Sequence, residues 1–460
     1  MKHWILAAMA ALLAGCGTLR PDRPEPLADY LPETYAEAGG EAVLTEAWWH
    51  SFGSGELNRL LDEALAGNLT IAQYSARLRQ QQALAAKANA GKIPSVAGTA
   101  SAGTTWPDVT ENSRTEAYGL GLTASYELDL WGRVRSTAQA ALLNRDASRQ
   151  DLQSAMMTLS ANIAQTWLSI IAQQTKLDLL HRQLEANTQV LELLQLRQRN
   201  AISTALDVLQ QRQIVESTRA LVPDAELRLG LLESQLNVLL GRPAGTAIRI
   251  ETRTPPPMPP LPATGLPADL LAKRPDIQAG LLRLESRDWS VAAARADRLP
   301  TLTLGGSLSA ADSDIGNVID QWAGNLVAGL AAPLIDGGRR RAEVDFQKAL
   351  AEEAVATYRS LVLNAVAEVN DALLSERKIA ARRDMQQKQY EALSNQLDEA
   401  QLRYRRGLND YLAVLNALAA KQGLERNLIN SAMEVYTARI ELHRALGGDW
   451  MAAAANQRAE

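Results

Sequence analysis

The chain has 460 residues, of which 47% are hydrophobic and 22% charged, so a packed structure is expected and wholesale disorder is excluded. Its net charge is -5 and its Lys and Arg residues are spread along the chain, which leaves no basic surface for nucleic acid. One Cys and four scattered His exclude a thiolate zinc site and show no metal-ligand spacing, so we expect neither a metal nor a cofactor.

Residues 1–15 are predicted to form a signal peptide. Lys2 precedes a short apolar run, Trp4 to Leu13, that is too short to span a membrane. The sequence Leu13-Ala14-Gly15-Cys16 resembles the lipobox of bacterial lipoproteins, which implies cleavage before Cys16 and acylation of that residue. The alternative is an ordinary signal sequence with an incidental Cys. Gly17, where Asp would suggest retention in the inner membrane, favours the outer membrane.

No later stretch reaches the roughly eighteen apolar residues that a transmembrane helix needs. If the mature chain crosses a membrane, it must therefore do so with strands. The sequence also contains no nucleophile elbow, no phosphate-binding glycine loop and no recognisable pair of catalytic carboxylates. We therefore expect that the protein is not an enzyme.

The sequence repeats itself at an offset of 206 residues, from about residue 60 to residue 241. Leu matches are frequent by chance in such a chain, but matches of Pro, Gly and Arg at one register are not. A self-match at a fixed period predicts a repeated architecture. The matched pairs include Pro94 with Pro300, Gly132-Arg133 with Gly338-Arg339, and Leu240-Gly241 with Leu446-Gly447.

The repeat and the linker between its halves define the predicted domains. The linker is rich in Pro, and such a run favours an extended polyproline conformation that acts as a stiff spacer. The predicted segments are a signal peptide (1–15), a lipid anchor with an extended segment (16–55), a first repeat (56–253), the linker (254–266), a second repeat (267–447) and a tail (448–460).

Each half is predicted to hold the same elements in the same order. A shorter helix, about 56–91 or 267–297, comes first and two strand-like stretches follow. A long helix then covers residues 133–200 or 339–406, which contain no Gly or Pro and would span about 100 Å. Narrow stripes of Leu on these helices favour coiled-coil packing with a broad wet surface.

Each long helix is predicted to end in a short break and a returning helix. The breaks fall at Ala201-Ile202-Ser203 and Gly407-Leu408-Asn409, and the returning helices are expected to end at Gly241 and Gly447. Pro223 is predicted to kink or interrupt the first returning helix.

Four stretches are predicted to be strands. Residues 118–128, 301–308 and 322–334 alternate apolar with small or polar side chains, and 95–105 is a weaker Gly/Ala-rich stretch. Each is about 9–12 residues long, the length of a tilted transmembrane strand. Trp106, Tyr118 and Trp322 are near strand ends, where aromatic girdles lie. The alternation also suits a small soluble sheet packed on helices, which remains an alternative.

Membrane-spanning strands would require the chain to oligomerise. Known single-chain barrels begin at about eight strands, so four strands cannot close one. An open sheet edge in lipid leaves backbone groups unpaired, each at a cost of about several kcal/mol. Identical chains must then complete the sheet together, and symmetry alone would allow a dimer, a trimer or a tetramer.

Several motifs together resemble one protein family. They are Trp48-Trp49-His50-Ser51-Phe52, Glu127-Leu128-Asp129-Leu130-Trp131-Gly132-Arg133, Lys273-Arg274-Pro275-Asp276-Ile277 and Tyr404-Arg405-Arg406-Gly407 with Tyr411-Leu412. On these motifs the chain resembles the TolC-like outer-membrane efflux factors of resistance-nodulation-division (RND) tripartite pumps, in the lipoprotein branch of OprM, CusC and NodT. The match covers nearly the whole chain after Cys16.

The resemblance implies a fold class that is mainly α with a membrane β part. A trimer would form a 12-stranded β-barrel, four strands per chain, continuous with a long periplasmic α-helical barrel. An equatorial region would be built from the chain ends and the segment near Pro223. The implied partners are a periplasmic adaptor protein, an inner-membrane RND pump and outer-membrane lipid, and the implied location is the cell outer membrane.

The resemblance also implies a periplasmic gate at the two helical turns. Tyr404 falls on an aromatic position that bonds across helices to a carboxylate, Asp207, and Leu412 falls on a hydrophobic ring. Asn416 stands at a position where many relatives carry Asp, and Ala413 stands where some relatives carry a second Asp. A cation-selective ring is therefore not implied here. The turns are candidates for adaptor contact, with Ala201, Ser203 and Thr204 on the first and Gly407, Leu408 and Asn409 on the second.

The sequence favours a passive gated conduit that exports small molecules or metal ions. Two alternatives stay open. One is an outer-membrane tunnel for type I protein secretion, and the other is a lipid-anchored periplasmic coiled-coil scaffold without a pore. The sequence does not name the exported substrate.

Overall fold

The computed structural model describes residues 31–37, 39–42, 47–106 and 114–448. These residues divide into two compact units. Unit 1 contains Ala76–Gln150 and Asp276–Leu361, and unit 2 contains Ala28–Ser75, Asp151–Pro275 and Val362–Glu460. Cys16, the predicted site of acylation, and the predicted tail after residue 448 lie outside the described residues.

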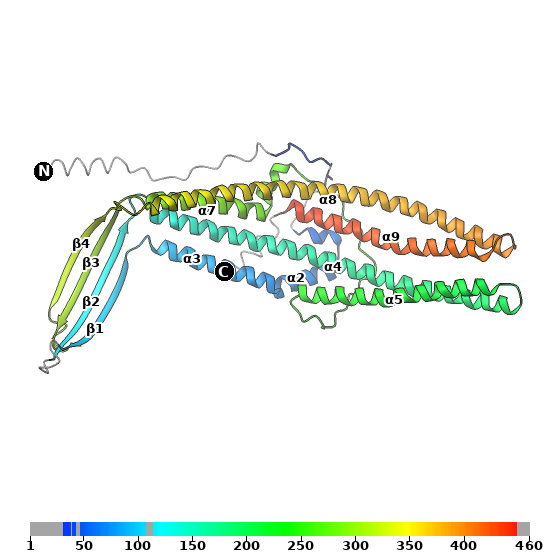
Figure 1. Cartoon of the computed structure of the whole chain (residues 1–460), viewed down its shortest axis with the longest axis horizontal. Helices are drawn as coiled ribbons and strands as arrows, with labels where there is room; N and C mark the ends of the chain where they lie inside the picture. Colours follow the sequence, from blue (N-terminus) through cyan, green and yellow to red (C-terminus); the bar gives the residue numbers. More distant parts are fainter. Residues whose placement is uncertain (1–30, 38, 43–46, 107–113, 449–460) are drawn as a thin grey trace. The chain divides into compact units, whose positions relative to one another are not determined.

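Unit 1 contains a four-stranded antiparallel sheet in the order β1-β2-β3-β4 (Figure 1). The strands are β1 Ser95–Thr105, β2 Thr115–Leu128, β3 Thr301–Asp312 and β4 Trp322–Ala331. All four predicted strands are present. β2 is longer than expected, with 14 residues, and β4 ends before Leu334 because Pro333 has no N–H to donate to a neighbouring strand.

The two faces of the sheet differ in chemistry, as the alternation predicts. Side chains on opposite strands align in rows, such as Leu122, Leu308 and Gly324 on one face. The next row is Thr123, Ser307 and Asn325, and it lies on the other face because successive residues of a strand point to opposite sides. One face is therefore mainly apolar and the other is built of small, mostly uncharged polar residues.

The edges of the sheet are β1 and β4, which have no further partner strand in the described part of the chain. Trp106 follows the last residue of β1 and is 55% exposed, and Trp322 begins β4 and is 47% exposed. Tyr118 is paired with Ala102 near the same end of the sheet. The three aromatic side chains thus cluster at one end of the strands.

Each long helix begins with an aspartate cap after a strand. α4, Arg133–Arg199, starts where the Asp129 carboxylate accepts hydrogen bonds from the backbone N–H groups of Val134 (2.9 Å) and Arg135 (2.8 Å). Arg133 donates to both oxygens of Glu127 at 3.0 and 2.6 Å. Gly132 has a φ of +80°, which a side chain would disfavour. The Glu127–Arg133 motif therefore builds this turn.

The second repeat uses the same device. α8, Arg339–Arg405, is preceded by Asp336, whose carboxylate accepts from the N–H groups of Gly338 (3.0 Å) and Arg340 (3.2 Å). These bonds hold the pKa of Asp336 below its usual value. α4 and α8 are both 67 residues long and start 206 residues apart, so the predicted repeat is present in the structure.

The first helix of each half is broken, contrary to the prediction of one helix per half. In the first half α2, Gly55–Gly67, and α3, Leu69–Ala90, meet at Asn68. The Asn68 side chain caps the N–H of Ile71 (3.0 Å) and donates to the carbonyl of Leu239 (2.8 Å). A cap and a tertiary bond at one residue favour a new helix start.

In the second half a 3-10 turn, η3 Pro267–Asp269, and α6, Leu270–Lys273, precede α7, Pro275–Ala296. Pro275 begins α7, because it cannot supply the N–H that would continue α6. Arg274 at the break is buried and pairs with Glu368 at 2.7 Å.

Unit 2 contains two helical hairpins, formed by the ends of α4 and α8 with the returning helices (Figure 1). The returning helices are α5, Ala205–Leu239, and α9, Tyr411–Leu446. α5 runs through Pro223 without interruption, so of the two outcomes predicted at this residue, a kink or an interruption, the interruption is wrong. Pro223 is exposed, and water can satisfy the carbonyl that loses its helical partner. Each helix in the described part of the chain is too short or too polar to span a lipid bilayer.

The Pro-rich linker and the N-terminal segment pack together within unit 2. The N–H of Gly40 donates to the carbonyl of Pro262 (2.9 Å), and the N–H of Ala263 donates to Ala42 (2.8 Å). Two residues of α9 hold the linker: Tyr436 donates to the carbonyl of Pro256 at 2.6 Å, and Arg439 donates to that of Pro259. The acceptors are three residues apart, the repeat of a polyproline helix.

Candidate gate at the two helical turns

The turn between α4 and α5 is stabilised by hydrogen bonds among residues of the turn and the adjoining helix ends. The N–H of Ile202 donates to the carbonyl of Arg197 (2.9 Å), which places Ala201 in the left-handed region with a φ of +57°. Thr204 then caps α5 and its side chain accepts from the N–H of Asp207 (3.2 Å). The Asp207 carboxylate returns a bond to the N–H of Thr204 (3.0 Å), completing a capping box.

The turn between α8 and α9 has the same backbone and different side chains. The N–H of Leu408 donates to the carbonyl of Arg403 (2.9 Å), and Gly407 takes the left-handed conformation with a φ of +71°. Gly407 is the repeat counterpart of Ala201 and meets no steric penalty there. Asp410 precedes α9 without a side-chain cap bond in the described structure.

Most of the predicted adaptor-contact residues are exposed. Ala201, Thr204, Gly407 and Leu408 are exposed, and Leu408 retains 70% of its accessible surface. Ser203 and Asn409 are half-buried. Among the described side-chain atoms, the Asn409 carbonyl oxygen is buried without a hydrogen-bond partner.

The four predicted gate residues lie close to these turns but do not all contact one another in a single chain. The Asp207 carboxylate accepts from Ser203 Oγ (2.9 Å) through the same oxygen that serves the capping box. The Tyr404 hydroxyl is buried and has no hydrogen-bond partner among the described residues. The structure therefore contains no Tyr404–Asp207 bond within one chain.

Leu412 and Asn416 lie one helical turn apart on the exposed side of α9. Leu412 keeps 44% of its surface accessible and Asn416 is also exposed, while Val414, Leu415 and Ala417 between and beside them are buried. Side chains four residues apart share a helix face. The two predicted ring positions thus project away from the hairpin core.

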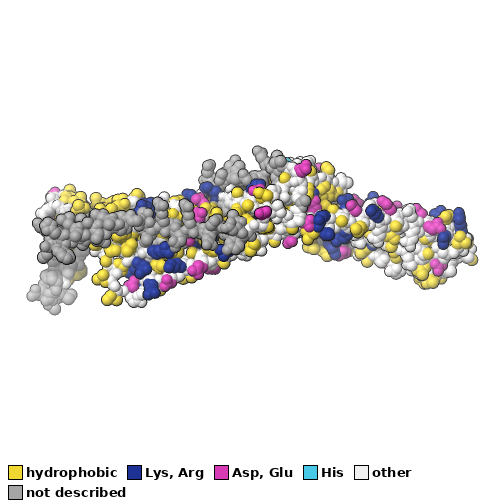
Figure 2. All heavy atoms as spheres, turned by 90° about the horizontal axis from the view of Figure 1, so that it is seen from above, with side chains coloured by type: hydrophobic (Ala, Val, Ile, Leu, Met, Phe, Trp, Pro, Cys, Tyr) yellow, Lys and Arg dark blue, Asp and Glu magenta, His cyan; other side chains and the backbone are white. Residues whose placement is uncertain are grey.

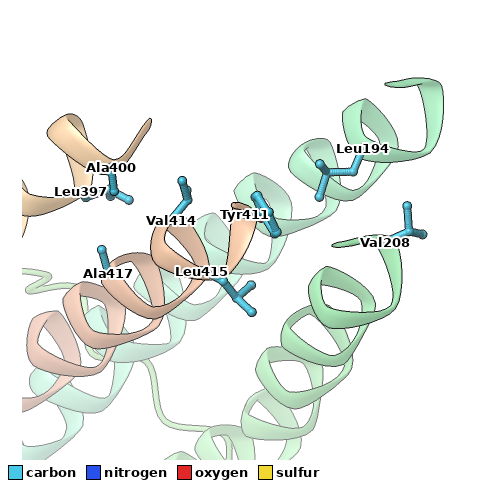
Figure 3. Close-up of a cluster of buried hydrophobic side chains, with 8 residues drawn as sticks. All are labelled: Leu194, Val208, Leu397, Ala400, Tyr411, Val414, Leu415 and Ala417. Carbon is cyan, nitrogen blue, oxygen red and sulfur yellow. The ribbon is translucent and has the colours of Figure 1, made fainter. Parts of the chain in front are cut away.

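A cluster of buried apolar side chains holds the ends of both hairpins together (Figure 3). Leu194 comes from α4, Val208 from α5, and Leu397 and Ala400 from α8. The rest come from α9 and are Tyr411, Val414, Leu415 and Ala417. Because all four helices contribute, the two turns belong to one packed body.

Tyr411, which the motif analysis did not place in the gate, belongs to this cluster and contacts the predicted gate residue Tyr404. It is 3% exposed, its hydroxyl donates to Gln211 Oε1 at 2.7 Å, and its ring packs edge-on against the Tyr404 ring at 5.4 Å. Burial raises the pKa of Tyr411, aided by the nearby Asp207. The Arg197 guanidinium lies 5.0 Å from the Tyr404 ring centre. Tyr404 is therefore fixed by ring contacts, with its hydroxyl left unbonded.

The exposed surface of the helices carries charged side chains of both signs. Figure 2 shows Lys and Arg side chains interspersed with Asp and Glu along the described helices. Exposed pairs such as Arg403 with Glu399 (2.7 Å) and Arg219 with Glu216 (2.7 Å) follow helical spacing. Such exposed pairs contribute little to the stability of the fold, about 0–1 kcal/mol each.

Comparison with known proteins now decides the family. The model described as "Outer membrane efflux protein" matches residues 60–242 and 266–448, and the second match lies 206 residues after the first at both ends. The chain belongs to this family.

Two relatives and one solved structure illustrate how similar the efflux protein is to other members of the family. It is 32% identical to the pyoverdine export outer membrane protein OpmQ of Pseudomonas putida, over 98% of this chain and 98% of that protein. It is 31% identical to the outer membrane protein OprJ of Pseudomonas aeruginosa, over 97% and 96%. The structure of the outer-membrane channel OprN superposes with a TM-score of 0.86 at 27% identity, covering 94% of this chain and 100% of that one.

These likenesses confirm the main predictions. The efflux protein is an outer-membrane channel component with two structural repeats, a mainly helical fold and a strand part. The alternative of a scaffold without a pore is wrong, because the family and its solved member are outer-membrane efflux proteins.

Proposed function

We propose that three copies of this efflux protein close one gated conduit for small molecules, with twelve strands in the outer membrane and helices reaching into the periplasm. The observation that requires several copies is the four-stranded sheet with β1 and β4 as open edges, and the number three is supported by the likeness to the outer-membrane channel OprN. An open edge cannot face lipid, because its unpaired N–H and C=O groups would lack partners. Pairing β1 of one copy with β4 of the next satisfies every strand. Native mass spectrometry in detergent should give three chains; a single chain would refute the proposal.

The partners in this proposal are a periplasmic adaptor protein and, through it, an inner-membrane RND pump. The adaptor contacts the two turns, where exposed Thr204 and Leu408 present small and aliphatic side chains. A photo-crosslinker placed at Thr204 or Leu408 should capture a co-expressed adaptor. The same crosslinker at Lys378, exposed on α8 away from the turns, is the matched control and should capture none.

The gate in this proposal is a bond between the Tyr404 hydroxyl and the Asp207 carboxylate in the closed trimer. The hydroxyl is buried without a partner in one chain. Asp207 uses one oxygen for Ser203 and Thr204, and its other oxygen carries no hydrogen bond among the described residues. A charge-assisted bond of this kind contributes about 1.5–3 kcal/mol, and three copies could hold a two-state tip shut.

The gate is tested by single-channel conductance in planar bilayers. Tyr404→Phe removes only the hydroxyl and should raise the conductance, because the closed state loses its bond while the ring contacts remain. Asp207→Ala should raise it too, with an added loss of the helix cap. Tyr390→Phe, on the same helix, is the control and should conduct like the wild type. Unchanged conductance in both gate variants would contradict the assignment.

Leu412 and Asn416 form successive rings in the proposed trimer, and the second ring is uncharged. Three amides at Asn416 should select neither cations nor anions. Asn416→Asp would introduce three carboxylates at one level and should shift the reversal potential toward cation selectivity in a salt gradient. A variant with the wild-type reversal potential would mean that residue 416 does not line the pore.

Lipid attachment at Cys16 completes the proposal. Several acyl chains anchor firmly, since each buried CH₂ contributes about 0.8 kcal/mol. The mass of the N-terminal peptide of the mature wild type should include acyl groups, and Cys16→Ser should lack them. The exported molecules are proposed to be small, since one relative is named for pyoverdine export, and this favours efflux over type I protein secretion.

A further inference from the structure

A cluster of buried amide side chains ties one helical hairpin of unit 2 to the other. Asn187 on α4 and Gln422 on α9 form a reciprocal pair, in which each side-chain amide donates to the carbonyl oxygen of the other, at 3.1 and 2.9 Å. Asn187 also donates to Thr218 Oγ1 on α5 (3.1 Å). Asn187 is fully buried and Gln422 is 6% exposed, so these hydrogen bonds are shielded from water.

The amide cluster continues to the gate through Gln211 on α5. Gln211 is fully buried, donates to the backbone carbonyl of Asn187 at 2.8 Å, and accepts the Tyr411 hydroxyl at 2.7 Å. Tyr411 in turn packs against the ring of Tyr404. One unbroken series of contacts therefore runs from the Asn187–Gln422 pair to the proposed gate tyrosine.

These amides occupy core positions of a coiled coil. Asn187 stands seven residues after Leu180 and seven before Leu194, both of which are buried apolar residues. On α5, Gln211 and Thr218 alternate with buried Val208 and Val215 at the same heptad spacing. Apolar core positions tolerate a shift of one helix along another, whereas a buried polar residue satisfies its bonds in one register only.

We propose that Asn187, Gln211 and Gln422 are positioning residues of the tip gate: they fix the axial register of α9 against α4 and α5. That register sets the height at which Tyr404 and Leu412 stand in the tip. The inference rests on the proposed gate. Without these three amides, the apolar cluster of Figure 3 and the bonds of Gln183 to Arg426 (2.6 Å) and Glu425 (2.7 Å) would still hold the hairpins together, at a register that the amides no longer set.

Melting temperature and conductance together distinguish an effect on helix register from an effect on stability. Asn187→Leu leaves the buried Gln422 amide without its partner and should lower the melting temperature of the trimer. The double variant Asn187→Leu/Gln422→Leu removes both amides and inserts the residue type found one heptad away, so the melting temperature should recover. The double variant should nevertheless lose the single conductance level of the wild type and show several levels.

A second readout reports the register directly. In protein labelled with 3-fluorotyrosine, the fluorine resonances of Tyr404 and Tyr411, assigned with the Phe variants, should each be one line in the wild type. In the double Leu variant they should split or shift. Ser431→Ala is the matched control, because buried Ser431 bonds Gln386 (2.5 Å) within one hairpin and does not bridge the two. It should leave both lines and the conductance unchanged.

Two results would overturn the inference. One is a stable double variant with unchanged resonances, and the other is split resonances with the wild-type conductance level. Failure of the proposed gate is distinct from both. In that case Tyr404→Phe would leave the conductance unchanged, while the resonances of the double variant would still split.

Discussion

Replacing Arg439 on α9 and Glu376 on α8 with Met, singly and together, separates the two roles of one buried cation. Its guanidinium donates to both oxygens of Glu376 on α8, with Nε 2.8 Å from Oε2, and it also donates to the carbonyl of Pro259 in the linker. The Arg439 and Glu376 side chains are 6% and 13% exposed. Removing one partner of such a pair strands a buried charge and should cost about 3–5 kcal/mol.

The double variant Arg439→Met/Glu376→Met removes both charges. Because apolar replacement of a whole buried pair is often nearly neutral, its stability should return to within about 2 kcal/mol of the wild type. The coupling between the two sites would then be about 4 kcal/mol or more. Both variants at Arg439 also lose the bond to Pro259, whereas Glu376→Met keeps it.

Trimeric membrane proteins commonly unfold irreversibly, so the rate of heat dissociation measures their stability. Each single variant should dissociate about a hundredfold faster or more, since about 1.4 kcal/mol corresponds to a factor of ten. Arg253, just before the linker, is exposed. Trypsin cleavage after Arg253 reports release of the linker and should accelerate in both variants that lack Arg439. Equal dissociation rates for the single and double variants would refute the ion-pair reasoning.

Two further predictions concern single residues of unit 2. Ala201→Gly should stabilise the first turn by about 1 kcal/mol, because its φ of +57° strains any residue with a Cβ, whereas Gly407→Ala should destabilise the second by a similar amount; heat dissociation rates of the two variants measure both. Burial of His443 against Trp48 (ring centres 5.3 Å apart) lowers its pKa to about 4, aided by Arg439, so the neutral form is favoured in the fold. Unfolded His443 binds its proton near pH 6.5, so stability should fall by about 3 kcal/mol per chain between pH 6.5 and pH 4. His443→Phe should remove that part of the pH dependence of the melting temperature.

The helices and strands could be predicted because local signals determine them. Residues 133–199 and 339–405 hold no Gly or Pro, and both helices end where the chain must turn left-handed, at Ala201 and Gly407. The break at Asn68 could not be foreseen, because it depends on a tertiary partner, the carbonyl of Leu239, which no local pattern names. At the other break Pro275 is a local signal, whereas the pairing of Arg274 with Glu368 depends on packing that the sequence does not show.

The gate could be predicted only in part, for a related reason. The motif placed Tyr404 and Leu412 near the turns, but it gave no sign that Tyr411 would be held by Gln211. One signal was nevertheless present in the sequence. Asn187 interrupts a heptad of buried Leu, and an amide at such a position is typical of a bonded contact in a core. The identity of its partner depends on how α9 packs, which the spacing on α4 does not contain.

The two turns occupy equivalent positions in the repeat but differ in how many of their polar groups are hydrogen-bonded. The first turn carries a capping box from Thr204 and Asp207 and needs no outside donor. In the second turn, the Tyr404 hydroxyl and the side-chain amide oxygen of Asn409 are buried without hydrogen-bond partners among the described residues. Buried unpaired groups cost about 1–3 kcal/mol each, so the second turn gains more than the first when a neighbouring chain or an adaptor supplies the missing partners. The two turns therefore differ in what a partner could add: the polar groups of the first are satisfied by its own capping box, whereas the second has two that are not.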